Sequence, residues 1–115
     1  MQVYAITKNV RMSAQKMREM VRQIQGLPAV QAQAVLAVVP RKSARVVAKT
    51  LKSAIANAED HAQRDKVRLD VRMLRVKEAV AGTATSMKRF TPKARGSAGP
   101  IIKRSCHVKI TVSDE

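Results

Sequence analysis

Residues 86–107 read SMKRFTPKARGSAGPIIKRSCH, and this stretch decides how the chain is organised. Thr91-Pro92, Arg95-Gly96 and Gly99-Pro100 interrupt it, so it cannot continue as a helix. Strand-like sequence lies on both sides, RLDVRMLRV before it and CHVKITV after it. So long a connection between two strands of a small domain is either functional or disordered. It holds no acidic residue, and its basic residues are Lys88, Arg89, Lys93, Arg95, Lys103 and Arg104.

The chain begins with a pattern typical of a strand followed by a helix. Residues 3–12 alternate, and the larger apolar side chains share one parity, which predicts a strand that buries that face. They are Tyr4, Ile6, Val10 and Met12. Ser13 is a suitable N-cap for a helix that runs to about Gln25, and Gly26 suits its C-terminal end. Apolar residues of this helix form one stripe, which predicts core packing: Met17, Met20, Val21 and Ile24.

Two further helices are expected before the next strand. One begins at Leu27-Pro28 and ends before Pro40, with Val30, Ala34, Val35 and Val38 along one side. The other runs from about Arg41 to His61 and gives the clearest helical periodicity in the chain. Its apolar residues recur at three- and four-residue steps: Ala44, Val47, Ala48, Leu51, Ala54, Ile55 and Ala58.

Residues 67–80 and 107–112 read as the remaining strands. The first alternates through Val67, Leu69, Val71 and Met73, but Leu74 and Val76 change parity, which predicts a β-bulge near Met73-Leu74. The last strand has its apolar residues, Val108, Ile110 and Val112, on one parity.

We therefore expect an α+β fold in which three helices pack with a three-stranded antiparallel sheet. At 115 residues the chain should form a single domain, residues 1–115, with residues 80–102 as a long basic β-hairpin that projects from it. Arms of about 11 residues reach roughly 35 Å, whereas a globule of this size has a radius of gyration near about 13 Å. A two-stranded arm is marginal in water, so the hairpin needs a partner that packs around it.

The charge indicates the class of partner. The chain has 23 Lys and Arg against 8 Asp and Glu, a formal net charge of +15. So dense a positive charge favours binding to a polyanion, and nucleic acid is the usual polyanionic partner. A membrane-active basic helix fits less well because the charges are spread over several kinds of segment. No apolar run approaches the roughly 18 residues of a membrane span, and the N-terminus lacks the features of a secretory or transit signal.

Two groups of residues are candidates for phosphate contact. One is a set of helical cations with no acid among them, which could also be an ordinary solvated face: Arg41, Lys42, Arg45, Lys49 and Lys52. The other is the basic residues of the hairpin, where the alternative is a solvated loop. Irregular or single-stranded RNA can accept such an arm through phosphate contacts and guanidinium stacking.

Catalysis is not expected. His61, His107 and the single cysteine, Cys106, give no metal-ligand spacing, and no phosphate-binding or dinucleotide glycine pattern occurs. Cys106 lies near Lys103 and Arg104 but has no general base, so a small strand residue is the simpler reading. We predict no enzyme activity, no metal and no cofactor. A lone cysteine also suits a reducing compartment.

The sequence resembles the bacterial large-subunit ribosomal protein twenty-two family over nearly its whole length. The most specific matches are Met87-Lys88-Arg89, residues 92–96 (PKARG), and Lys103-Arg104 followed by His107. VRMSAQKMREMVRQIQG and LKSAIANAE also match the family's helices. The chain departs from the usual family sequence at Ala14-Gln15, at residues 82–85 and at Ser97.

The resemblance implies a cytoplasmic, structural protein of the ribosome. Such a protein binds large-subunit rRNA early in assembly, contacts neighbouring ribosomal proteins, and lines the nascent-polypeptide exit tunnel with its hairpin. It implies no membrane partner. By position, Met87, Lys88, Arg89 and Phe90 would form the tunnel-lining tip. RNA-binding positions carried over or supported by the charge pattern are Arg11, Lys16, Arg18, Arg45, Lys49, Lys88, Arg89, Lys93, Arg95, Lys103, Arg104 and His107.

One alternative stays open at this point. A free-standing basic DNA- or RNA-binding regulator could use the first two helices as a helix-turn-helix reader. Such a protein would still bind nucleic acid without the hairpin, which distinguishes the two hypotheses.

Overall fold

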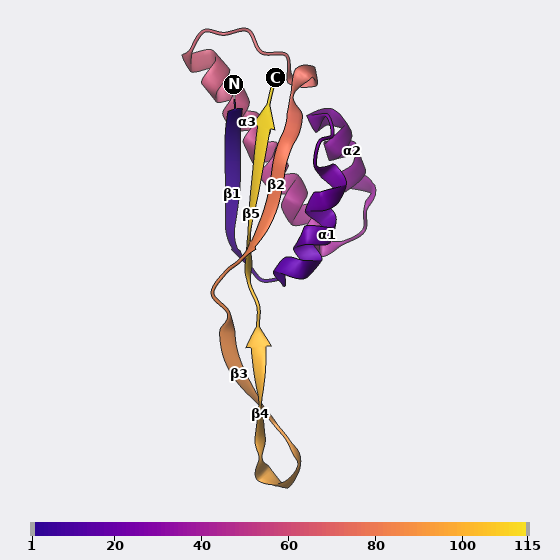
Figure 1. The fold of residues 1–115 in the computed structure, drawn as a ribbon, viewed down its shortest axis with the longest axis vertical. Helices are drawn as coiled ribbons and strands as arrows, with labels where there is room; N and C mark the ends of the chain where they lie inside the picture. Colours follow the sequence, from indigo (N-terminus) through magenta and orange to yellow (C-terminus); the bar gives the residue numbers. More distant parts are fainter. Residues whose placement is uncertain (1, 115) are drawn as a thin grey trace.

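A computed structural model describes residues 2–114 of the chain (Figure 1). The elements are, in order, β1 (Gln2–Val10), α1 (Ala14–Ile24), α2 (Ala29–Val38), α3 (Lys42–Arg64), the 3-10 turn η1 (Val71–Met73), β2 (Arg75–Thr83), β3 (Met87–Pro92), the 3-10 turn η2 (Ala94–Gly96), β4 (Ala98–Lys103) and β5 (Cys106–Ser113). Helices and strands follow one another as the α+β prediction requires.

The body of the protein is a sheet in the order β1-β5-β2, with all neighbours antiparallel. The last strand is thus the central one, and Ile110 lies opposite Ala5 on one side and Ala79 on the other. The helices cover one face of this sheet, with α3 running across it (Figure 1). The predicted pairing of the strands before and after the hairpin is therefore confirmed.

Local sequence signals set the ends of the helices. The Ser13 side chain accepts a hydrogen bond from the Lys16 backbone N–H at 3.4 Å and caps α1. Gly26 follows that helix with φ +83°, a left-handed conformation that costs glycine little. Pro28 immediately precedes α2, where its missing N–H is no loss. The predicted helices agree with the structure to within about three residues, as boundary assignments allow.

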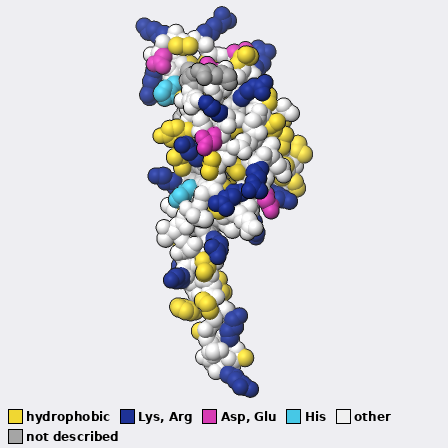
Figure 2. Space-filling model, viewed as in Figure 1, with side chains coloured by type: hydrophobic (Ala, Val, Ile, Leu, Met, Phe, Trp, Pro, Cys, Tyr) yellow, Lys and Arg dark blue, Asp and Glu magenta, His cyan; other side chains and the backbone are white. Residues whose placement is uncertain are grey.

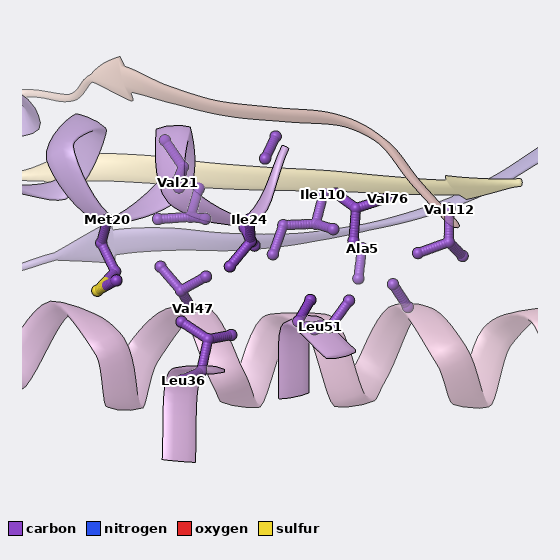
Figure 3. Close-up of a cluster of buried hydrophobic side chains, with 14 of the residues drawn as sticks. Ala5, Met20, Val21, Ile24, Leu36, Val47, Leu51, Val76, Ile110 and Val112 are labelled. Carbon is purple, nitrogen blue, oxygen red and sulfur yellow. The ribbon is translucent and has the colours of Figure 1, made fainter. Parts of the chain in front are cut away.

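The core is aliphatic and lies between the sheet and the helices (Figure 3). α1 contributes the predicted methionine stripe, and α3 contributes its predicted apolar face. The largest fully buried side chains are Met17, Met20, Ile24, Leu51, Leu74 and Ile110. The single Phe and the single Tyr lie outside it, at 78% and 57% exposure for Phe90 and Tyr4. The core is thus built from aliphatic and methionine side chains, as expected.

The predicted buried face is wrong for the first half of β1, whereas Val10 and Met12, predicted on the same parity, are half-buried and pack against the core. Val3 and Ala5 point inward and are buried, whereas Tyr4 and Ile6 are exposed on the opposite face of the sheet. Small side chains suit this face because β1 packs directly on α3, where the Thr7 and Thr50 hydroxyls lie 2.6 Å apart. Tyr4 instead places its ring 4.9 Å from Lys109 Nζ. Side-chain size alone favours Tyr4 and Ile6 for the core, but the space beneath the strand fits the smaller side chains.

The strand expected to begin at Val67 also needs correction. Residues 65–70 form no strand, η1 follows, and β2 begins only at Arg75. Asp70 caps the turn by accepting a hydrogen bond from the Arg72 backbone N–H at 3.0 Å. The parity change at Met73-Leu74 marks this turn, and the irregularity in the strand lies between Val76 and Glu78. Alternation in the sequence was misleading because the backbone makes its hydrogen bonds within the turn instead of to a neighbouring strand.

β3 and β4 form a separate two-stranded arm that points away from the body (Figure 1). Met87 pairs with Lys103 at the root and Pro92 with Ala98 at the far end. The described residues extend 67 × 27 × 16 Å with a radius of gyration of 17.6 Å, well above the roughly 13 Å of a compact chain of this length. The hairpin was expected to start at Val80, but residues 80–83 still pair with β5, so the free arm is residues 87–103.

Candidate nucleic-acid interface

The arm has two chemically different faces. Cross-strand partners point to the same side of a ladder, so the register divides the side chains into two sets. One set pairs Met87 with Lys103, Arg89 with Ile101 and Thr91 with Gly99. The other set pairs Lys88 with Ile102, Phe90 with Pro100 and Pro92 with Ala98. We call these the basic face and the apolar face of the arm.

Arg89, Lys93 and Lys103 give the basic face its charge. The side chain of Lys93 lies over Gly99, because a Cβ built on Gly99 would come within 2.6 Å of Lys93 Cε. Arg89 donates one guanidinium hydrogen bond to the Lys88 carbonyl at 2.9 Å and a second contact to Met87 Sδ at 3.7 Å. These lysines and arginines are exposed, and no carboxylate occurs between residues 86 and 107. The face therefore presents cations with no internal counter-ion.

The turn of the arm is tight and conformationally restricted. The Lys93 backbone N–H donates to the Ser97 carbonyl at 2.7 Å, and the Ser97 hydroxyl donates to the Ala94 carbonyl at 2.8 Å. Arg95 has φ +59° and Gly96 has φ +71°. A left-handed Arg costs of order 1 kcal/mol, whereas glycine adopts this conformation easily. The turn therefore carries a cation at a position where glycine would be easier to accommodate. Lys and Arg side chains are spaced along the arm and reach this end of it (Figure 2).

Met87–Phe90 do not lie at the turn. They form most of β3, with Met87 at the root, and the turn itself is residues 93–97. The description of these four residues as the tip is therefore wrong as geometry. Phe90 is 78% exposed and lies on the apolar face.

A basic pocket of about 420 Å³ lies at the root of the arm. It is lined by Ser13, Ala14, Gln15, Arg18, Thr83, Ala84, Ser86, Arg104 and Ser105. The Arg18 Nε donates to the Ala81 carbonyl at 3.0 Å, which fixes the guanidinium at the edge of the sheet. Two guanidinium groups and several hydroxyls around one hollow form a chemically suitable phosphate site. The serines of this pocket were not predicted, because nothing in the local sequence links them to Arg18.

The other predicted cations surround this root or follow α3 away from it. Lys42 Nζ donates to the Arg11 carbonyl at 3.4 Å, which places the start of α3 beside the loop between β1 and α1. Lys16 is exposed on the first turn of α1. Arg45 and Lys49 are exposed one and two turns further along α3.

His107 has a structural contact. Its Nδ1 accepts a hydrogen bond from the Asn9 backbone N–H at 3.0 Å and joins β5 to the irregular end of β1. The RNA-binding role expected for His107 stays a prediction, and this contact occupies only its Nδ1.

Acidic residues lie away from the arm. Most of the described acidic residues lie on the second half of α3 and in the loop after it. There Asp60 pairs with Arg64 at 3.1 Å, and Asp70 pairs with Arg72 at 3.6 Å. On the face seen in Figure 2, acidic side chains occur on the body and none on the arm. The molecule is therefore purely basic at one end and mixed in charge at the other.

The potential metal ligands of the described residues are scattered. Among residues 2–114, no group of three or more His, Cys, Asp or Glu side chains could hold a metal ion. Cys106 is fully buried, and burial raises the pKa of its thiol. In the same range, no helix is long and apolar enough to cross a membrane.

Comparison with known proteins gives one consistent result. Residues 5–113 match the family model described as Ribosomal protein L22p/L17e. The chain is 46% identical over 114 residues to the large ribosomal subunit protein uL22 of Opitutus terrae, covering 99% of this chain and 96% of that protein. It is 43% identical over 115 residues to the protein of the same name from Akkermansia muciniphila, covering 100% and 98%. The similarity therefore includes the arm as well as the body.

Proposed function

The chain belongs to the ribosomal protein L22p/L17e family, and on this premise we propose that it binds large-subunit rRNA through the arm and its root and lines the polypeptide exit tunnel with the arm. As a ribosomal protein of this family it is a structural protein rather than an enzyme. Its place would be the large subunit of cytoplasmic ribosomes, beside neighbouring ribosomal proteins.

The observation that carries the proposal is the acid-free arm. It is a two-stranded ribbon with no core of its own, and such a ribbon is marginally stable in water. Its cations repel one another unless a polyanion neutralises them. RNA meets both needs, because phosphates supply the counter-charge and the surrounding nucleotides supply the packing.

The two faces of the arm support a tunnel-wall position. RNA phosphates suit the basic face of Arg89, Lys93 and Lys103. The apolar face, with Phe90, Pro100 and Ile102, offers phosphates only Lys88. An extended apolar surface on the side away from the RNA suits a wall along which a polypeptide passes.

The shape of the molecule supports an early role in assembly. An arm that reaches far beyond the body must be in place before RNA closes around it. The mixed charge at the opposite end suits a position on the outer surface of the particle, away from the densest phosphate.

An arm-deleted variant tests RNA binding. Since Met87 and Lys103 are directly paired, residues 88–102 can be replaced with Asn-Gly, a dipeptide that closes a two-residue hairpin. We expect the full chain to sediment with large subunits and the shortened chain to remain mostly free, while both give the same thermal melting of the body. Failure of the full chain to sediment with large subunits contradicts the ribosomal role. Full RNA affinity of the shortened chain would favour a helical reader instead.

The tunnel position needs a separate experiment. A photo-crosslinking residue at Phe90 should react with a nascent polypeptide stalled on the ribosome, and the same residue at Arg89 should react with rRNA. These neighbours lie on opposite faces, so they form a matched pair. Crosslinking of position 90 to RNA alone would contradict the tunnel-lining assignment.

A further inference from the structure

A second hollow, of about 400 Å³, lies on the body beside the root of the arm. Its lining residues are Met12, Lys16, Glu19, Arg41, Lys42 and Ser43. Lys16 and Glu19 of α1 line this hollow, whereas Gln15 and Arg18 of the same helix line the pocket at the root. Successive helical residues are about 100° apart, so the two hollows lie on neighbouring sides of the first turns of α1. We call the second one the α3 hollow, because α3 begins at its edge.

The N-terminus of α3 brings backbone donors to this hollow. The first N–H groups of an α-helix have no carbonyl partner within the helix. The Ser13 side chain caps α1, and the Leu74 carbonyl accepts a bond from the first N–H of α2. In α3 the N-cap residue is Arg41, whose side chain makes no capping bond. Among residues 2–114, nothing outside the helix accepts a bond from the N–H groups of Lys42 or Ser43. The positive end of a 23-residue helix therefore lies at the hollow.

Ser43 contributes a buried hydroxyl to the same place. The residue is only 4% exposed and lines the hollow. Side chains of a helix tilt toward its N-terminus, so this hydroxyl points back toward the hollow. No hydrogen bond within residues 2–114 ends on it, although every fully buried polar side-chain atom of that range has a partner. A nearly buried hydroxyl with no partner costs free energy unless a ligand supplies the missing bond.

The charges around the hollow favour an anion. Three cations, Lys16, Arg41 and Lys42, face one carboxylate, that of Glu19. Arg41 Nη1 lies 3.1 Å from Glu19 Oε2, so this carboxylate already has its counter-ion. Lys42 Nζ makes one contact, to the Arg11 carbonyl at 3.4 Å, and Lys16 is exposed. Both ammonium groups therefore have donors left for a ligand.

We propose that the α3 hollow binds one phosphate of large-subunit rRNA, at a contact separate from those of the arm and its root. The phosphate oxygens accept hydrogen bonds from the Ser43 hydroxyl and from the backbone N–H groups of Lys42 and Ser43, and Lys16 supplies counter-charge. A helix N-terminus with such donors is a recurrent phosphate site. The occupant is RNA because the hollow adjoins the root pocket across one side of α1, so a strand bound at the root continues onto it. This inference rests on the proposed function.

The variant Ser43→Ala distinguishes ligand binding from a structural role. Removal of a hydroxyl that bonds nothing in the protein should leave the thermal melting temperature unchanged or raise it. Loss of a hydrogen bond to a charged phosphate should weaken binding of the full chain to large-subunit rRNA by about tenfold or more. The matched control is Ser53→Ala, at an exposed position of the same helix. It should change the affinity by less than about twofold.

The variant Ser43→Asp adds a test by charge. A carboxylate in the first turn of α3 interacts favourably with the helix dipole, so the fold should be kept. The phosphate would meet a like charge, so the affinity for rRNA should fall by about 100-fold. The slope of log K against log salt should fall by about 0.7 to 0.9, because one phosphate contact is lost. Ser53→Asp lowers the net charge equally, from +15 to +14, and should weaken binding by less than about threefold.

The outcomes separate this inference from the function on which it rests. Equal rRNA affinities for Ser43→Asp and Ser53→Asp overturn the phosphate site alone. A melting temperature that falls with Ser43→Ala but not with Ser53→Ala overturns it as well, since the hydroxyl would then bond within the protein. Unchanged rRNA affinity of Ser43→Asp, together with its exclusion from large subunits, would identify a protein carboxylate as the occupant and overturn the RNA assignment. Failure of the unaltered chain to bind large-subunit rRNA overturns both proposals.

Discussion

Neutralising the basic face of the arm should weaken RNA binding in a way that salt dependence can measure. The perturbation is the triple variant Arg89→Gln, Lys93→Gln and Lys103→Gln, which removes three cations from one side of the ribbon. Each side chain is exposed and lies outside the core. The body should therefore keep its thermal melting temperature, and only the electrostatic contribution to binding should change.

The magnitude follows from counterion release. Each phosphate contact contributes about 0.7 to 0.9 to the slope of log K against log salt. Loss of three contacts should therefore reduce the slope by about 2 to 3, and weaken binding by about 100- to 500-fold at roughly 0.1 M salt. The assay is binding of the full chain to large-subunit rRNA over a series of salt concentrations.

A matched control separates the face from the overall charge. Arg64→Gln, Lys66→Gln and Arg68→Gln remove three cations from the opposite end of the molecule, so both variants fall from +15 to +12. We expect the control to change the slope by less than about 1. Both triple variants lose the same long-range attraction to RNA, but the control loses no phosphate contact. Equal slopes for the two triple variants, or no change in either, would refute the assignment of RNA binding to the basic face.

Three further predictions concern stability. Leu51→Ala, at a fully buried position of α3, should lower the free energy of unfolding by about 2 to 5 kcal/mol in urea titration, and a loss under about 1 kcal/mol would contradict the core described above. Burial raises the pKa of the Cys106 thiol above its ordinary value of 9.0, so the unfolded chain loses the thiol proton at a lower pH than the folded chain. The free energy of unfolding should therefore fall as pH rises above about 9. Cys106→Ala should make this decline shallower, and identical pH profiles for the two proteins would contradict the prediction. Arg95→Gly should stabilise the free arm by roughly 1 kcal/mol because the left-handed backbone at φ +59° suits glycine, and hydrogen exchange of the arm amides should slow; unchanged or faster exchange would count against strain at the turn.

The helices, the sheet pairing and the existence of the arm were accessible from sequence, since each depends on a local signal. Ser13, Gly26 and Pro40 mark helix ends, and the methionine stripe of α1 has one clear apolar side. The strand predicted from Val67 to Met73 is wrong because it, too, was inferred from a local pattern alone. A few alternating residues fit a turn that packs Leu69 and Val71 on the core as well as they fit a strand.

The candidate site was accessible as a list of residues but not as an arrangement. Charge and resemblance marked Arg18 and Arg104, yet only the fold brings them to one pocket with serines from three segments of the chain. The register of β3 and β4 likewise decides that Arg89 and Phe90, adjacent in sequence, face opposite sides. Neither result follows from composition, because both depend on which residues lie opposite each other after folding.

The sequence by itself determined the three helices, the +15 charge and a long arm without acids, because propensity, capping and charge act over a few neighbouring residues. Only the tertiary structure decided which side of an ambiguous element is buried. In β1 the small Val3 and Ala5 are inside and Tyr4 is outside; in α2, Ala32 and Leu36 are inside and Val38 is outside. The physical reason is that burial depends on the shape of the neighbouring surface, which here is the closely packed helix α3, and no single segment contains that information.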